Sequence, residues 1–235
     1  MEMNSRLGLR RQVAIVAKHS FYAEDIRNAL TGLEIEIVSS GDIWEIQEHI
    51  DAGTNFDFIF FPHYSKVISE VFLERSYCIG FHTGDLPDDR GGSPIQHKIL
   101  RGEYNTFVSA MKLVNEIDAG DVLCDEPISL EHGSIEEILK NISKVIARMT
   151  RLILTEKLAP RPQIGSLLTS KRLKPQESEL DLGALNMRGI YDRIRMLDGL
   201  DYPPAHIKVG PHKFVLSNAQ LGDGKLTFSS QLEEK

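Results

Sequence analysis

The chain has 235 residues, of which 41% are hydrophobic and 26% charged, and its formal net charge at pH 7 is −7. This length suits one large domain with a substantial core and a small appendage. Because the net charge is negative, we do not expect the protein to bind nucleic acid. No stretch approaches the ~20 consecutive apolar residues that a membrane helix needs. We therefore expect a cytoplasmic protein without membrane contact, whose cysteines, Cys78 and Cys124, are buried free thiols.

Short apolar runs alternate with helical patterns in the first part of the chain. Strands are predicted at 13–17, 34–38 and 58–61, and helices at 23–30 and 43–50. Strands that alternate with helices at this spacing indicate βαβ units and a parallel sheet.

A polar loop follows the fourth predicted strand, at 77–81. The preceding residues, 63–75, are expected to contain a short helix. The loop ends in a helix at 94–100, for which Ser93 is the candidate N-cap and Gly102 the candidate C-cap.

Beyond this helix, residues 107–114 and a strand from 122 are expected to form an antiparallel hairpin on the sheet edge. A capping-box pattern opens a long helix at 134–158. The C-terminal part is predicted to hold a helix and three short strands, at 183–197, 206–209, 213–216 and 226–228.

These elements predict an α/β fold, with a Rossmann-like, mostly parallel sheet, an edge hairpin and a small C-terminal helix and β unit. The segment Ala159-Pro160-Arg161-Pro162 marks a boundary. We expect a catalytic domain at 1–160, a linker at 161–180 and the small unit at 181–235.

Two polar turns carry the candidate chemistry. His82 lies where the fourth strand ends, and Asp118 lies in the hairpin turn, 36 positions later. Polar groups at the carboxyl end of a strand occupy the usual ligand crevice of an α/β sheet. An imidazole can take or relay a proton near neutral pH, and a carboxylate can orient it. We therefore predict an acid–base pair; each residue alone would also fit an ordinary loop histidine or turn aspartate.

The loop and the turn also resemble a known family. Residues 82–95, HTGDLPDDRGGSPI, followed by IDAGD at 117–121, are similar to the signature of the folate-dependent formyltransferases. The resemblance covers roughly the first two thirds of the chain. It implies transfer of a formyl group from N10-formyltetrahydrofolate to a primary amine, with His82 and Asp118 in acid–base roles. Where the family pattern has Asn-x-His, this chain has Gly80 in place of the asparagine.

A formyltransferase also needs a hydrogen-bond donor to the oxygen that gains charge. Gly80 opens space for such a donor, which a side chain elsewhere or a backbone N–H of the loop would supply. By resemblance, the folate pocket is walled by residues 64–71 and 115–118. The residues expected to bind substrate or cofactor are Gly80, Thr83, Ser93, Gln96, His63, Asn115 and Ile117.

The other charged residues are expected to have structural roles or to face solvent. Arg90 is expected to hold the loop by pairing with one of its aspartates, and His97 to face solvent. The basic run at 171–174 fits a solvated linker. No cluster of His, Cys, Asp or Glu has the spacing of metal ligands, so no catalytic metal is predicted.

The preferred acceptor is a nucleotide-linked amino sugar, chosen by elimination. An acidic chain with a C-terminal region of about 70 residues fits tRNA poorly, and that region exceeds what a minimal purine-pathway enzyme needs. The alternatives are a methionyl-tRNA-type formyltransferase, a formyltetrahydrofolate hydrolase, and a binding protein without turnover because of Gly80. A homodimer is left open.

Overall fold

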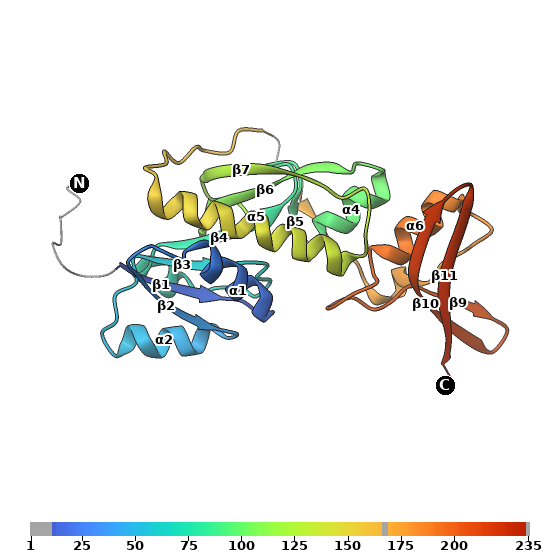
Figure 1. Cartoon of the computed structure of the whole chain (residues 1–235), viewed down its shortest axis with the longest axis horizontal. Helices are drawn as coiled ribbons and strands as arrows, with labels where there is room; N and C mark the ends of the chain where they lie inside the picture. Colours follow the sequence, from blue (N-terminus) through green and yellow to red (C-terminus); the bar gives the residue numbers. More distant parts are fainter. Residues whose placement is uncertain (1–10, 166–168, 234–235) are drawn as a thin grey trace. The chain divides into compact units, whose positions relative to one another are not determined.

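The computed structural model (Figure 1) describes residues 11–165 and 169–233 and contains a six-stranded sheet with the order β2-β1-β3-β4-β6-β7. Strand β1 pairs in parallel with β2 and β3, and β3 pairs in parallel with β4. The predicted parallel sheet is therefore confirmed. Its first elements are β1 (Arg11–Val16), α1 (Ser20–Ala29), β2 (Ile35–Ser40), α2 (Ile43–Asp51), β3 (Phe58–Phe61), α3 (Glu70–Arg75) and β4 (Cys78–Thr83).

The predicted edge hairpin is formed by β6 (Asn105–Lys112) and β7 (Val122–Ser129). The Leu113 N–H donates to the Cys78 carbonyl, and the Gly84 N–H donates to the Phe107 carbonyl. Because the residue numbers rise along β4 as they fall along β6, these two strands run antiparallel. Near the hairpin turn, the Lys112 N–H donates to the Asp121 carbonyl.

Apolar runs become strands here because they are covered on both faces. In β3, Ile59, Phe60 and Phe61 are at most 1% exposed. Alternate residues point to opposite faces of a sheet, so Ile59 and Phe61 lie in one core cluster with Cys78. Full burial of such a side chain stabilises the fold by about 1.5–3 kcal/mol. Both cysteines are free thiols, but only Cys78 is buried as predicted, whereas Cys124 is half-buried.

The polar loop leads into β5 (Arg90–Gly91) and α4 (Pro94–Arg101), and β5 pairs in parallel with β8 (Thr169–Ser170). Gly102 is the C-cap of α4, as predicted, with a φ of 72°. Ser93 is the N-cap residue of α4, as predicted, but its side chain makes no capping hydrogen bond. Ser93 has a left-handed φ of 54° instead of the extended conformation typical of N-caps, and its hydroxyl accepts from the Leu173 N–H at 3.1 Å.

The rest of the chain also follows the predicted order of elements. It contains α5 (Ile135–Thr155), the 3-10 helix η1 (Pro175–Ser178), α6 (Met187–Arg195), β9 (His206–Val209), β10 (His212–Gly222) and β11 (Lys225–Glu233). The last three strands form an antiparallel sheet with the order β11-β10-β9. This confirms the predicted C-terminal helix and β unit, although β10 and β11 extend well beyond their apolar centres.

The chain divides into two compact units. The described residues up to His82 form the first unit together with Val108–Glu126 and Ser143–Ile164. The second comprises Thr83–Phe107, Pro127–Ile142 and the described residues from Gly165 onward. The predicted domain boundaries at 160 and 180 stay a prediction. In the described part of the chain, no helix has both the length and the hydropathy to span a bilayer.

Candidate active site

His82 and Asp118 meet in the first compact unit. His82 lies near the end of β4, Asp118 lies in the turn between β6 and β7, and Nδ1 of the imidazole is 3.4 Å from Oδ2 of the carboxylate. The His82 side chain is 6% exposed and that of Asp118 is 19% exposed. The two groups are thus within ion-pair distance, with the imidazole buried and the carboxylate partly exposed. Hydrogen bonds of catalytic pairs are often longer without substrate.

The hairpin turn that carries Asp118 has an unusual backbone. Asp118 has a φ of 52°, in the left-handed region that few residues other than glycine adopt, although aspartate is enriched there. Gly120 lies so close to β6 that a Cβ placed on it would be 1.6 Å from the Lys112 carbonyl oxygen. Only glycine can occupy that position without opening the turn.

A side chain from beyond α5 completes the turn. The Gln163 amide nitrogen, Nε2, donates to the Asp118 carbonyl and to the Gly120 carbonyl, at 2.8 Å in both cases. Sequence reasoning missed Gln163. In the sequence, Gln163 is marked only by its position directly after the proline-rich segment, and that segment indicates a domain boundary.

The space beside Gly80 is filled by an apolar side chain. A Cβ on Gly80 would lie 2.5 Å from Cδ2 of Leu113, a residue that packs against the core cluster of the first unit. Gly80 therefore does not leave room for a replacement polar group at its own position, contrary to the expectation from the sequence.

The other predicted site residues are divided between the two units. His63, Asn115 and Ile117 belong to the first unit, with His82 and Asp118. His63 follows β3 with a φ of 49°, and its ring stacks on that of Tyr22 at a centroid distance of 6.0 Å.

Thr83, Ser93 and Gln96 belong to the second unit. Gln96 is fully buried there, and its amide nitrogen donates to the Met196 carbonyl at 3.3 Å. In the described part of the chain, its Oε1 is buried without a hydrogen-bond partner, and the binding role expected of Gln96 stays a prediction.

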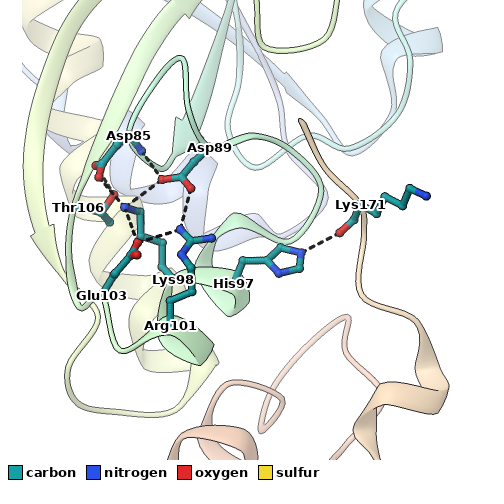
Figure 2. Close-up of polar contacts among 8 residues, drawn as sticks. All are labelled: Asp85, Asp89, His97, Lys98, Arg101, Glu103, Thr106 and Lys171. Atoms are coloured by element: carbon teal, nitrogen blue, oxygen red, sulfur yellow. Dashed lines mark hydrogen bonds and ion pairs between the residues drawn. The ribbon is translucent and has the colours of Figure 1, made fainter. Parts of the chain in front are cut away.

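The polar loop is held by cations of α4 (Figure 2). The Lys98 ammonium, 5% exposed, lies 3.0 Å from a carboxylate oxygen of Asp89 and also contacts Asp85 and Glu103. Arg101 pairs with Asp89 at 2.8 Å. Burial alone would raise the pKa of the Asp89 carboxyl, but the Asp85 N–H, Lys98 and Arg101 outweigh it, so this pKa lies below its usual value. The expected pairing of Arg90 with one of the loop's aspartates stays a prediction.

The segment 169–173 is not a free linker. The Gly92 N–H donates to the Ser170 carbonyl, and the partly buried His97 places Nε2 2.8 Å from the Lys171 carbonyl oxygen (Figure 2). His97 is thus partly exposed, and its ring also contacts the backbone of the basic run. The side chains of Lys171 and Arg172 are exposed, as expected of the basic run.

Sequence comparisons connect the chain to one kind of enzyme. The family described as "Methionyl-tRNA formyltransferase, C-terminal domain" matches residues 175–231. A methionyl-tRNA formyltransferase of Wolinella succinogenes is 31% identical over 142 residues, which are 59% of this chain and 46% of that protein. The chain spans about half the length of the curated relatives it matches.

Solved structures extend the similarity to nearly the whole chain. A methionyl-tRNA formyltransferase from Clostridium thermocellum is 32% identical, with a TM-score of 0.85 over 96% of this chain and 100% of that one. A 4-N formyltransferase from Francisella tularensis has a TM-score of 0.68 at 15% identity, covering 97% of this chain and 100% of its own, and shares the fold.

Proposed function

Because this chain belongs to the formyltransferase family, we propose that it transfers a formyl group from N10-formyltetrahydrofolate to a primary amine. The observation that carries the proposal is the His82–Asp118 pair, with its 3.4 Å separation and its limited exposure. Formyl transfer moves protons on nitrogen atoms, and a partly shielded imidazole beside a carboxylate suits that task.

The bound co-substrate supplies a formyl carbon attached to a nitrogen that can leave. His82 takes the proton that the acceptor amine loses as its new C–N bond forms. It then delivers a proton to the departing nitrogen, so that the imidazole returns to its starting state. Because Nδ1 faces Asp118, Nε2 is the atom available for both transfers. Asp118 keeps the ring in this orientation and stabilises its cationic form.

The family asparagine would donate to the oxygen that gains charge, and Gly80 has no side chain to do so. Leu113 occupies the neighbouring space. We assign the donor to His82 itself, which is cationic once it has taken the amine proton. A charged donor in a shielded site stabilises developing negative charge strongly, so we expect turnover without an asparagine at position 80.

Exposed apolar side chains among the residues expected to wall the folate pocket support a flat heteroaromatic ligand. Val67 is 87% exposed and Ile117 is 65% exposed, which leaves apolar surface for the ring face. Residues 64–69 form an irregular segment between β3 and α3, whose backbone groups are suited to the polar edge of a pterin.

Methionyl-tRNA is the first acceptor we propose, in place of the nucleotide sugar preferred from the sequence alone. The match of residues 175–231 to the C-terminal domain of methionyl-tRNA formyltransferases supports it. A nucleotide-linked amino sugar is the second candidate, since a formal net charge of −7 favours a small acceptor over a polyanion.

The test incubates the protein with N10-formyltetrahydrofolate and either methionyl-tRNA or a panel of nucleotide-linked amino sugars. Mass spectrometry is expected to detect one added formyl group on an acceptor. His82→Ala should abolish the product, whereas His132→Ala, at a side chain 79% exposed in the second unit, should not.

The remaining possibilities give different results in the same assay. Formate release without an amine would identify a hydrolase. Saturable binding of 5-formyltetrahydrofolate by calorimetry, with neither reaction, would identify a binding protein. A protein that binds no reduced folate at millimolar concentration is not a formyltransferase.

A further inference from the structure

We propose that Gln163 is a positioning residue, which holds the Asp118 turn so that the carboxylate faces His82. The inference rests on the proposed function for its catalytic consequence, but the contact itself is independent of any substrate. Nothing in the loop motifs that resemble the family points to Gln163, which lies 45 positions from Asp118 along the chain.

Gln163 acts on the turn with both of its donors. A primary amide carries two N–H groups on one nitrogen, and Nε2 of Gln163 lies 2.8 Å from the carbonyl oxygens of both Asp118 and Gly120. One side chain therefore holds two carbonyl groups, one before and one after Ala119. A single bond would leave the turn free to pivot, whereas two bonds fix its orientation.

The turn needs such a restraint because its backbone is in an uncommon conformation. Asp118 has a φ of 52°, and Gly120 approaches the Lys112 carbonyl more closely than any other residue could. Such conformations persist where the surroundings over-determine them, and they are frequent at functional sites. The two hydrogen bonds from Gln163 are part of the surroundings that hold this conformation.

The Gln163 backbone is itself anchored. Arg161 and Val122 exchange both of their backbone hydrogen bonds, each 2.8 Å long, so that the segment extends the hairpin edge. The Arg161 guanidinium also pairs with Asp125. Pro160 and Pro162 flank Arg161 and fix their own φ angles. The side chain thus reaches the turn from a rigid base.

The consequence for catalysis follows from the His82–Asp118 geometry. Their separation is 3.4 Å, so a small relaxation of the turn would remove the carboxylate from the imidazole. A misplacement of about 1 Å can lower a catalytic rate about 100-fold. Gln163 would then affect turnover without touching a substrate.

The first test is spectroscopic and requires no activity. The ring ¹⁵N signals of His82, in protein labelled at its eight histidines, are assigned by their loss in His82→Ala. We expect Asp118→Asn to shift these signals and Gln163→Met to shift them in the same direction. Gln47→Met is the matched control, because Gln47 donates to Asp51 on the exposed face of α2; it should leave the His82 signals unchanged.

The second test is a kinetic double-mutant cycle. Gln163→Met is expected to lower kcat about 10- to 100-fold, and to have little further effect in the Asp118→Asn background. Effects that act through a shared group are not additive, whereas a general loss of stability would be. Should Gln163→Met fail to fold, Gln163→Glu has the same shape but presents acceptors to both carbonyls, and it replaces Gln163→Met in both tests.

Unchanged His82 signals in a folded Gln163 variant would overturn the assignment, as would additive losses in the cycle. It would also fail if Asp118→Asn left the His82 signals in place, since Asp118 would then not contact the ring. If the unaltered protein showed no formyl transfer, the proposed function would fall, while the spectroscopic result would still decide the role of Gln163.

Discussion

The substitution Gly80→Asn restores the residue that the family pattern has before its histidine, and the structure predicts that it is harmful. A Cβ at this position would lie 2.5 Å from Cδ2 and 3.2 Å from Cγ of Leu113. The end of the leucine side chain would have to move, and Leu113 packs against the core cluster of the first unit.

The size of the effect can be built from its parts. Forcing a side chain off its rotamer costs about 0.5–1.5 kcal/mol, and overpacking costs about 1–3 kcal/mol in total. Replacing a strand glycine stabilises the fold by about 0.5–1 kcal/mol, because the unfolded chain then has less conformational entropy. We therefore expect Gly80→Ala to lower the free energy of unfolding by about 1 kcal/mol. Gly80→Asn should lower it by about 2–3 kcal/mol, because its amide is buried as well.

Leu113→Ala provides the matched control, since it removes the atoms that clash. Chemical denaturation of the single and double variants should show that Gly80→Ala is less harmful, by about 1 kcal/mol, when Leu113→Ala is present. For a chain of this size, 1 kcal/mol corresponds to about 2–4 °C in Tm. Losses of stability that add within about 0.3 kcal/mol would refute the steric reasoning. So would a higher turnover for Gly80→Asn than for the unaltered protein.

His82→Ala and Asp118→Ala are each expected to lower the steady-state formyl-transfer rate about 10²–10⁴-fold with little change in Tm; near-normal turnover would remove that residue from the mechanism. Burial raises the pKa of the Cys78 thiol to about 12 from an ordinary 9.0. The native thiol should therefore resist iodoacetamide, and stability should fall as pH rises above 9.0, where only the unfolded chain ionises; rapid alkylation would contradict this. Lys98→Met leaves the buried Asp89 carboxylate with Arg101 as its cation and should destabilise the fold by about 1–3 kcal/mol at neutral pH. The stability that the lowered pKa of Asp89 contributes is present above its usual value of 3.8 and disappears as pH falls through the lowered pKa, so the deficit of Lys98→Met in denaturation curves should shrink on acidification.

The parallel sheet could be predicted because its strands are continuous apolar runs. Burial of β1 and β3 on both faces requires such runs, and their spacing requires helical crossovers. The His82–Asp118 pair could be predicted for a related reason. One residue ends a strand and the other lies in the turn of the adjacent hairpin, so the topology brings them together once the strand order is known.

The contacts that support the pair could not be predicted, because each joins distant segments without a local pattern. Gln163 follows two prolines, which indicated a boundary and said nothing of a hydrogen bond to a turn 45 positions earlier. The hydrogen bonds of residues 169–173 to Gly92 and Ser93 could not be predicted either, because an exposed basic run has the same composition as an unattached linker. Lys98 was missed because the loop's aspartates were assigned to the nearer Arg90.

Gly80 shows how such a contact alters the meaning of a motif. From the sequence, a missing asparagine indicated either a relocated donor or a lost activity. A strand glycine also weakens a strand, since it packs no side chain and has more chain entropy to lose. Leu113, the residue directly after β6, supplies a local reason for the glycine, because its side chain fills the position. Packing thus gives the glycine a structural reason that is independent of turnover. His82 and Asp118 lie 3.4 Å apart, and Gln163 restrains the turn that carries Asp118. Turnover depends on whether this pair can move protons without the asparagine of the family pattern.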